Sequence, residues 1–132
     1  MVKGRPEPAA DLVQRVAVTA TALPEAYEED AWTGVRWRIR MKTFAHVLVM
    51  DVDRAAHYFG SDARECTIVS FRSSGEELLA LTHAGPPYFK PPWAPTVVAL
   101  VLDDDTDWGE VAELVTDSYR LLAPQKLARL LP

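Results

Sequence analysis

Hydrophobic and polar residues alternate most clearly between positions 32 and 50, WTGVRWRIRMKTFAHVLVM. In the first half, apolar side chains at every second position are interleaved with three arginines, which is the period of a half-buried β-strand. The second half is a run of β-branched and aromatic residues and predicts another strand. We therefore expect an antiparallel hairpin that turns at Met41 and Lys42.

A two-residue turn at this place fixes the register of the hairpin and the composition of its two faces. It places Trp37 opposite His46. One face is then predicted to point into the core, with Val35, Trp37, Ile39, Phe44, His46 and Leu48. The other is predicted to be open and basic, with Arg36, Arg38, Arg40, Ala45, Val47 and Val49.

Further elements follow on both sides of the hairpin. Apolar residues at helical spacing over 9–23 predict an amphipathic helix that Pro24 ends. The acidic segment 25–31 is expected to pair with the hairpin as a strand, with Glu29 opposite Arg38. Two cross-strand charges would then neutralise each other at least in part.

The second half of the chain predicts strands and helices in turn. Residues 51–63 are polar and expected to be irregular, whereas 65–72 and the fully apolar 96–102 predict strands. Residues 73–84 predict a short helix. A last helix is expected after residue 106, because Asp107 and Glu110 have the spacing of a capping box. The sum is an α+β fold, an antiparallel sheet with the N- and C-terminal helices packed on one face.

Composition agrees with one compact domain. The chain has 132 residues, 48% of them hydrophobic and 25% charged, and we expect a flexible N-terminus over 1–8 and a single domain over 9–132. Its one cysteine, Cys66, excludes an internal disulfide and suits a reducing compartment. No run approaches the roughly 18 apolar residues of a membrane span. We expect a cytoplasmic protein without a membrane partner.

The arginine row is the first candidate site. Alternate side chains of a strand are about 6.6 Å apart, close to the phosphate spacing along one DNA strand. A net charge of −5 argues against indiscriminate coating of nucleic acid, but a local patch could contact its backbone. The candidate nucleic-acid-binding residues are Arg36, Arg38, Arg40 and Lys42, with Arg72 and Lys90 as supports. The alternative is a solvated sheet face whose arginines have cross-strand partners such as Glu29.

The proline-rich loop 86–95, PPYFKPPWAP, is the second candidate site. Five prolines stiffen it and exclude a helix or a central strand. Its aromatic residues Tyr88, Phe89 and Trp93 could stack on bases or line a pocket for a ligand or a partner. The alternative is a lid over the core.

Catalytic and metal sites are not predicted. Ser118 has no nearby base, and the histidines and Cys66 lack the spacing of metal ligands. Tyr119 is expected to be buried with its hydroxyl group bonded, Cys66 to be a small buried hydrophobe, and His46 to be a satisfied core histidine. We predict a protein that is not an enzyme and has no cofactor.

Three segments resemble the MmcQ/YjbR family: WRIRMKTFA, PPWAPTVVALVL and, most specifically, SYRLLAPQKL over 118–127. The likeness extends over roughly the whole chain. It implies a YjbR/CyaY-like fold, distantly related to frataxin, and the label of a DNA-binding protein that the family often carries. The chain departs from the family pattern in its Met-Lys hairpin turn, which is not glycine-rich, and in the long insert 51–63.

Two functions follow from the sequence. The first is non-enzymatic DNA binding through the basic hairpin. The second is a protein-interaction or small-ligand-binding module that uses the open sheet face and the aromatic loop. Frataxin-like iron binding is less favoured, because frataxins carry acids on the first helix and here that helix offers only Asp11.

Overall fold

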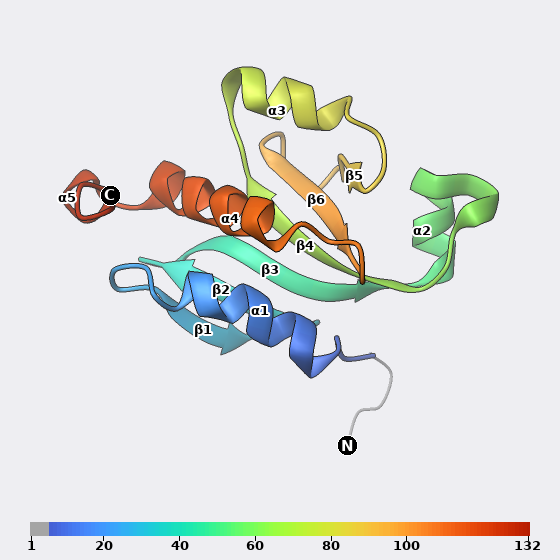
Figure 1. The fold of residues 1–132 in the computed structure, drawn as a ribbon, viewed down its shortest axis with the longest axis horizontal. Helices are drawn as coiled ribbons and strands as arrows, with labels where there is room; N and C mark the ends of the chain where they lie inside the picture. The colour runs from blue at the N-terminus through green and yellow to red at the C-terminus, as the bar shows by residue number, and fades with distance from the viewer. Residues whose placement is uncertain (1–5) are drawn as a thin grey trace.

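The computed structural model describes residues 6–132, and these form a six-stranded antiparallel sheet with helices on both faces (Figure 1). Of the N-terminus predicted to be flexible, residues 1–5 lie outside the described part, and residues 6–8 have no regular secondary structure. The strands are β1 (Tyr27–Asp30), β2 (Val35–Ile39), β3 (Lys42–Met50), β4 (Cys66–Arg72), β5 (Tyr88–Phe89) and β6 (Val97–Leu102). Their order across the sheet is β1-β2-β3-β4-β6-β5.

The helices are α1 (Ala10–Ala20), α2 (Val52–Phe59), α3 (Gly75–Thr82), α4 (Trp108–Leu122) and α5 (Gln125–Ala128), with a 3-10 turn, η1 (Gly60–Asp62). Helices α1 and α4 lie next to each other on one face of the sheet (Figure 1). This confirms the predicted α+β fold with its N- and C-terminal helices on one face. None of the helices in the described part of the chain is long and apolar enough to cross a membrane.

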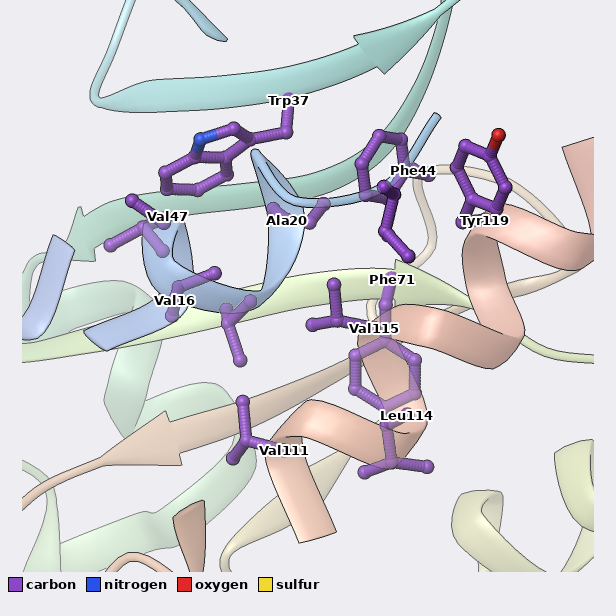
Figure 2. Packing of buried hydrophobic residues seen from close by; sticks show 14 of the residues in the cluster. Val16, Ala20, Trp37, Phe44, Val47, Phe71, Val111, Leu114, Val115 and Tyr119 are labelled. Atoms are coloured by element: carbon purple, nitrogen blue, oxygen red, sulfur yellow. The ribbon is translucent and has the colours of Figure 1, made fainter. Parts of the chain in front are cut away.

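The main core lies between these helices and the sheet. Trp37, Phe44 and Tyr119 are its largest side chains, all fully buried, and Val16 of α1 and Val115 of α4 fill the space around them (Figure 2). Because successive strand residues point to opposite faces, this core uses only alternate positions of each strand.

A second, smaller core lies on the other face of the sheet, under α2. The sequence prediction of an irregular segment at 51–63 is wrong: α2 begins after Asp51, whose carboxylate accepts the backbone N–H of Arg54 at 2.8 Å. A helix forms because this cap is followed by apolar residues at helical spacing, which pack on Ile68 and Phe89. The residues of this segment that belong to the smaller core are Ala55, Tyr58, Phe59 and Ala63.

The hairpin forms, but its predicted register is wrong, by two residues next to the turn and by one residue farther along the strands. The turn residues are Arg40 and Met41, with φ of 49° and 71°, and Ile39 pairs with Lys42. Two positive φ values match a turn whose twist suits a hairpin, so the strands close one residue earlier than expected. A bulge at Phe44, which has no partner on β2, then shifts the remaining pairs.

The bulge redistributes the side chains of β3. Phe44 and the next residue, Ala45, both join the main core, and so does Val47. His46 therefore pairs with Arg36 and not with Trp37, and it lies on the face opposite the main core. The predicted faces are correct for β2 and wrong for the β3 residues beyond the bulge, which are Ala45, His46, Val47, Leu48 and Val49.

Strand β1 exists as predicted, with a register two residues away from the expected one. Glu29 pairs with Arg36 and Tyr27 with Arg38. The reason is the connection, which is a four-residue loop from Ala31 to Gly34 closed by a backbone hydrogen bond of 3.0 Å between these two residues. The predicted register corresponds to a shorter turn, at Thr33 and Gly34.

The proline-rich segment also departs from the predicted loop. It contains the short edge strand β5, which pairs with Ala99 and Leu100 of β6. An edge strand of two residues is compatible with the surrounding prolines, because only one side of it must supply hydrogen bonds.

Candidate functional site

The arginine row of the hairpin is paired with carboxylates. Glu29 on β1 forms ion pairs with Arg36 and Arg38, accepting a hydrogen bond from Nε of Arg36 at 2.6 Å and one from Nη1 of Arg38 at 3.2 Å. Arg40 is paired with Glu25 at 2.9 Å. The hydrogen bond from Arg36 lowers the pKa of Glu29, so this carboxylate stays charged at neutral pH. The cross-strand neutralisation considered for this face is therefore present.

The other basic candidates do not extend the row into a free cationic surface. Lys42 is exposed at the start of β3, without an ion pair among the described residues. Arg72 on β4 donates from Nη1 to the Thr96 hydroxyl at 2.9 Å. Lys90 follows β5, four strands away from β2, and its ammonium donates to the carbonyl groups of Pro91 and Ala94 at 2.9 and 2.8 Å.

His46 lies beside the arginines on this side of the sheet. Its Nε2 is 2.6 Å from the carbonyl oxygen of Thr33, which indicates that this nitrogen carries the proton. Burial lowers the pKa of His46, and the charge of Arg36 acts in the same direction. The ring of His46 thus has a hydrogen-bond partner as predicted, but the residue lies outside the main core, which corrects its predicted place.

The three aromatic residues of the proline-rich loop do not form one surface. Phe89 is buried under α2, with ring centroids 4.5 Å from Tyr58 and 5.5 Å from Phe59. Tyr88 points to the other side and donates from its hydroxyl to Glu110 of α4 at 2.6 Å. Only Trp93 is well exposed, at 46%. The loop therefore contributes Phe89 to the smaller core and exposes Trp93 to solvent.

The residues that could have suggested catalysis are held in structural contacts. The Ser118 hydroxyl donates to the Phe44 carbonyl at 2.6 Å and accepts from the Arg72 backbone N–H at 2.8 Å. Tyr119 donates to the carbonyl of Pro24 at 2.7 Å, as expected of a buried tyrosine. Within the described residues no three His, Cys, Asp or Glu side chains are placed to hold a metal ion.

A wide groove lies where β4 begins and β6 ends, and the sequence did not reveal it. Its volume is about 1100 Å³. Figure 1 shows how the segments that frame it meet at this end of the sheet, with α2 on one side and the start of α4 on the other. The apolar part of its lining includes Tyr58, Phe59, Cys66, Val101, Pro86 and Pro87.

Cys66 belongs to this groove, which corrects its interpretation as a small buried hydrophobe. The residue is half-buried, and burial raises the pKa of its thiol, so the thiol stays protonated at neutral pH. Burial and the hydrogen bond to Glu110 likewise raise the pKa of Tyr88 on the groove wall. Both groups are neutral parts of the lining.

Charged residues around the groove are mostly acidic. Asp62 and Glu65 stand on the connection from α2 to β4, and Asp103, Asp105, Asp107 and Glu110 on the connection from β6 into α4. Arg64 is the basic residue among the described ones that line it. The helical spacing of Ala55, Tyr58 and Phe59 after the cap Asp51 was a sequence signal for α2, one wall of the groove, but not for the groove itself.

Comparison with known proteins finds a family that the sequence matches and a solved structure with a similar fold. The model of the family described as YjbR matches residues 21–121. A crystal structure of a protein from Pseudomonas syringae is similar with a TM-score of 0.51 and 17% identity, covering 75% of this chain and 78% of that chain. At this identity the likeness shows the fold alone. None of the curated proteins matches the chain.

Proposed function

The chain belongs to the YjbR family, and we propose that it is a binding protein without catalytic activity, whose groove receives part of a partner protein. The observation that carries the proposal is the groove itself, a concavity of about 1100 Å³ with partly exposed aromatic side chains in its lining. Concave surfaces with apolar linings and a few polar groups are the usual place for recognition. We further propose that the protein works in the cytoplasm.

The charges on the hairpin favour this surface over DNA binding. The basic residues Arg36, Arg38 and Arg40 share the face with Glu25 and Glu29, which pair with them. Affinity for DNA depends on cations that can replace the counterions of phosphates. Paired guanidinium groups would have to leave their carboxylates first, so the hairpin is a weaker candidate than its sequence suggests.

Partner capture tests the proposal. We expect Arg36→Gln/Arg38→Gln to retain the partners that the wild-type protein captures from native cytoplasm, because the groove is untouched. Ala63→Trp, which places an indole in the groove lining, should reduce capture about tenfold or more by blocking apolar contacts. Glu65→Trp on the rim provides a second blocking variant. Quantitative mass spectrometry of the captured proteins, after thermal unfolding confirms the fold, is the measurement.

The same variants distinguish partner binding in the groove from DNA binding by the hairpin. If capture is lost with Arg36→Gln/Arg38→Gln and retained with both groove variants, the proposal is wrong. A shift of duplex DNA at 50 mM salt that these glutamines abolish, with a log-log salt slope of about −0.9 per phosphate neutralised, would then assign the function to the hairpin.

A further inference from the structure

We propose that the groove binds a basic segment of a partner polypeptide, with an apolar or aromatic side chain against the groove lining and lysine or arginine side chains at the acidic rim. This inference rests on the proposed function and adds the chemistry of the partner. Two independent features of the groove carry it, its aromatic lining and the charge distribution around it.

The aromatic lining provides the apolar contact. Tyr58 and Phe59 are half-buried and held in place by Phe89, which both rings contact. Because Phe89 is anchored on β6 through its pairing with Ala99, the two rings have a rigid support. Fixed aromatic rings with exposed surface bind an apolar side chain without losing much conformational freedom themselves.

The rim provides the charge. Strands β4 and β6 are neighbours, with Thr67 opposite Leu102, so the acidic connections before β4 and after β6 lie at the same end of the sheet. Three rim carboxylates, Asp62, Glu65 and Asp105, make no hydrogen bond or ion pair with any described side chain. They are available to an incoming cation. The carboxylates of Asp103, Asp107 and Glu110 also have internal roles, as acceptors for Asp105 N–H, Glu110 N–H and the Tyr88 hydroxyl.

The distances between these carboxylates favour separate cationic side chains over a single metal ion. No three of them come close enough to hold a metal ion within the described part of the chain. Charges distributed around an apolar groove instead match cations that are separated along a chain and flank an apolar residue. The same negative rim repels nucleic acid, and the net charge of −5 adds to this repulsion.

Synthetic peptides test the inference directly. The probe is a fluorescein-labelled peptide with a central tryptophan, two lysines on either side and glycines at its ends. One comparison peptide has glutamates in place of the lysines, and another has glycine in place of tryptophan. Fluorescence polarisation with the full chain should show the lysine–tryptophan peptide binding at least about tenfold more tightly than either comparison peptide, and less tightly as salt is raised.

Matched variants assign this binding to the rim. Asp62→Asn/Glu65→Gln/Asp105→Asn removes three charges from the groove, and we expect it to weaken the lysine–tryptophan peptide about tenfold. Asp11→Asn/Glu76→Gln/Glu113→Gln removes three exposed charges on α1, α3 and α4 away from the groove. This control variant should change the dissociation constant less than twofold, since long-range effects of exposed charges are screened.

Equal binding of the lysine and glutamate peptides would overturn the inference, and so would equal weakening by the groove and control variants. The failure of the proposed function is distinguishable from both, because it appears as partner capture that the groove-blocking tryptophan variants leave unchanged. The lysine–tryptophan peptide could also fail to bind at millimolar concentration while partner capture still depends on the groove. That result would contradict the inference about a basic segment and leave the proposed function standing.

Discussion

Gly34→Ala is expected to lower the free energy of unfolding by about 3–5 kcal/mol, from a strained backbone and a steric overlap together. Gly34 ends the loop between β1 and β2 with a φ of +76°, which L-residues with a side chain rarely adopt. A Cβ atom at this position would overlap the carbonyl oxygen of Val47 and lie 2.9 Å from Cα of Leu48. Both are backbone atoms of β3 that cannot move without disturbing the sheet.

Urea unfolding followed by circular dichroism measures this loss, and Gly60→Ala is the matched control. Gly60 also has a positive φ, +64°, but a Cβ there would meet no atom within 4 Å. Its substitution should therefore cost only the strain of this backbone conformation, about 1–3 kcal/mol, without the steric overlap. Equal losses for the two variants would show that the backbone of β3 does not approach Gly34 as closely as described.

Ser118→Ala should destabilise the protein by about 2–4 kcal/mol, although it removes a single oxygen atom. The hydroxyl bridges the Phe44 carbonyl and the Arg72 backbone N–H, at the end of the β3–β4 ladder beyond the pair Ala45–Phe71. Phe44 is the bulged residue and has no strand partner there. Alanine would leave a buried acceptor and a buried donor without partners, each at about 1–3 kcal/mol.

The control for this variant is Ser74→Ala, because Ser74 is exposed and its side chain makes no capping hydrogen bond. It should change the free energy of unfolding, measured by urea unfolding, by no more than about 0.5 kcal/mol. Similar stabilities of Ser118→Ala and the wild-type protein would mean that water or a small backbone shift satisfies both groups. The role of Ser118 as the link between α4 and the sheet would then be wrong.

The elements that the sequence predicted well have a signal within a short window. The arginine and apolar alternation over β2 predicted its faces, and Asp107 and Glu110 predicted the start of α4, where Asp107 does accept the Glu110 backbone N–H at 3.1 Å. Ser118 and Tyr119 form the Ser-Tyr pair of the family resemblance, and the contacts of their hydroxyl groups link α4 to β3, to β4 and to the connection between α1 and β1.

The errors have physical reasons. Register depends on turn geometry, and the hairpin uses positive φ at Arg40 and Met41, two residues that give no sequence signal for it. The bulge at Phe44 then moved His46 to the other face. The segment over α2 is polar on average, and its apolar residues become visible only as a helical pattern that follows the Asp51 cap.

The groove could not be predicted because its residues come from segments far apart in the chain. Tyr58, Cys66, Pro87 and Asp105 become neighbours only once β4 and β6 pair and α2 packs on the sheet. The acids after β6 have the sequence signature of a helix cap, and this function accounts for Asp107 but not for Asp105. Sequence proximity alone gave no reason to combine them with the acids after α2.

Protection of Cys66 in the complex with the captured partner tests the central claim most directly. Cys66 is the sole cysteine of the chain and lines the groove, so its alkylation by iodoacetamide reports on access to this site. A Cys66→Ser/Lys42→Cys variant reports on the hairpin in the same way. If the groove receives the partner, alkylation of Cys66 slows about fivefold or more in the complex while Cys at position 42 reacts at its free rate. An unchanged rate at Cys66 together with protection at position 42 would contradict the account.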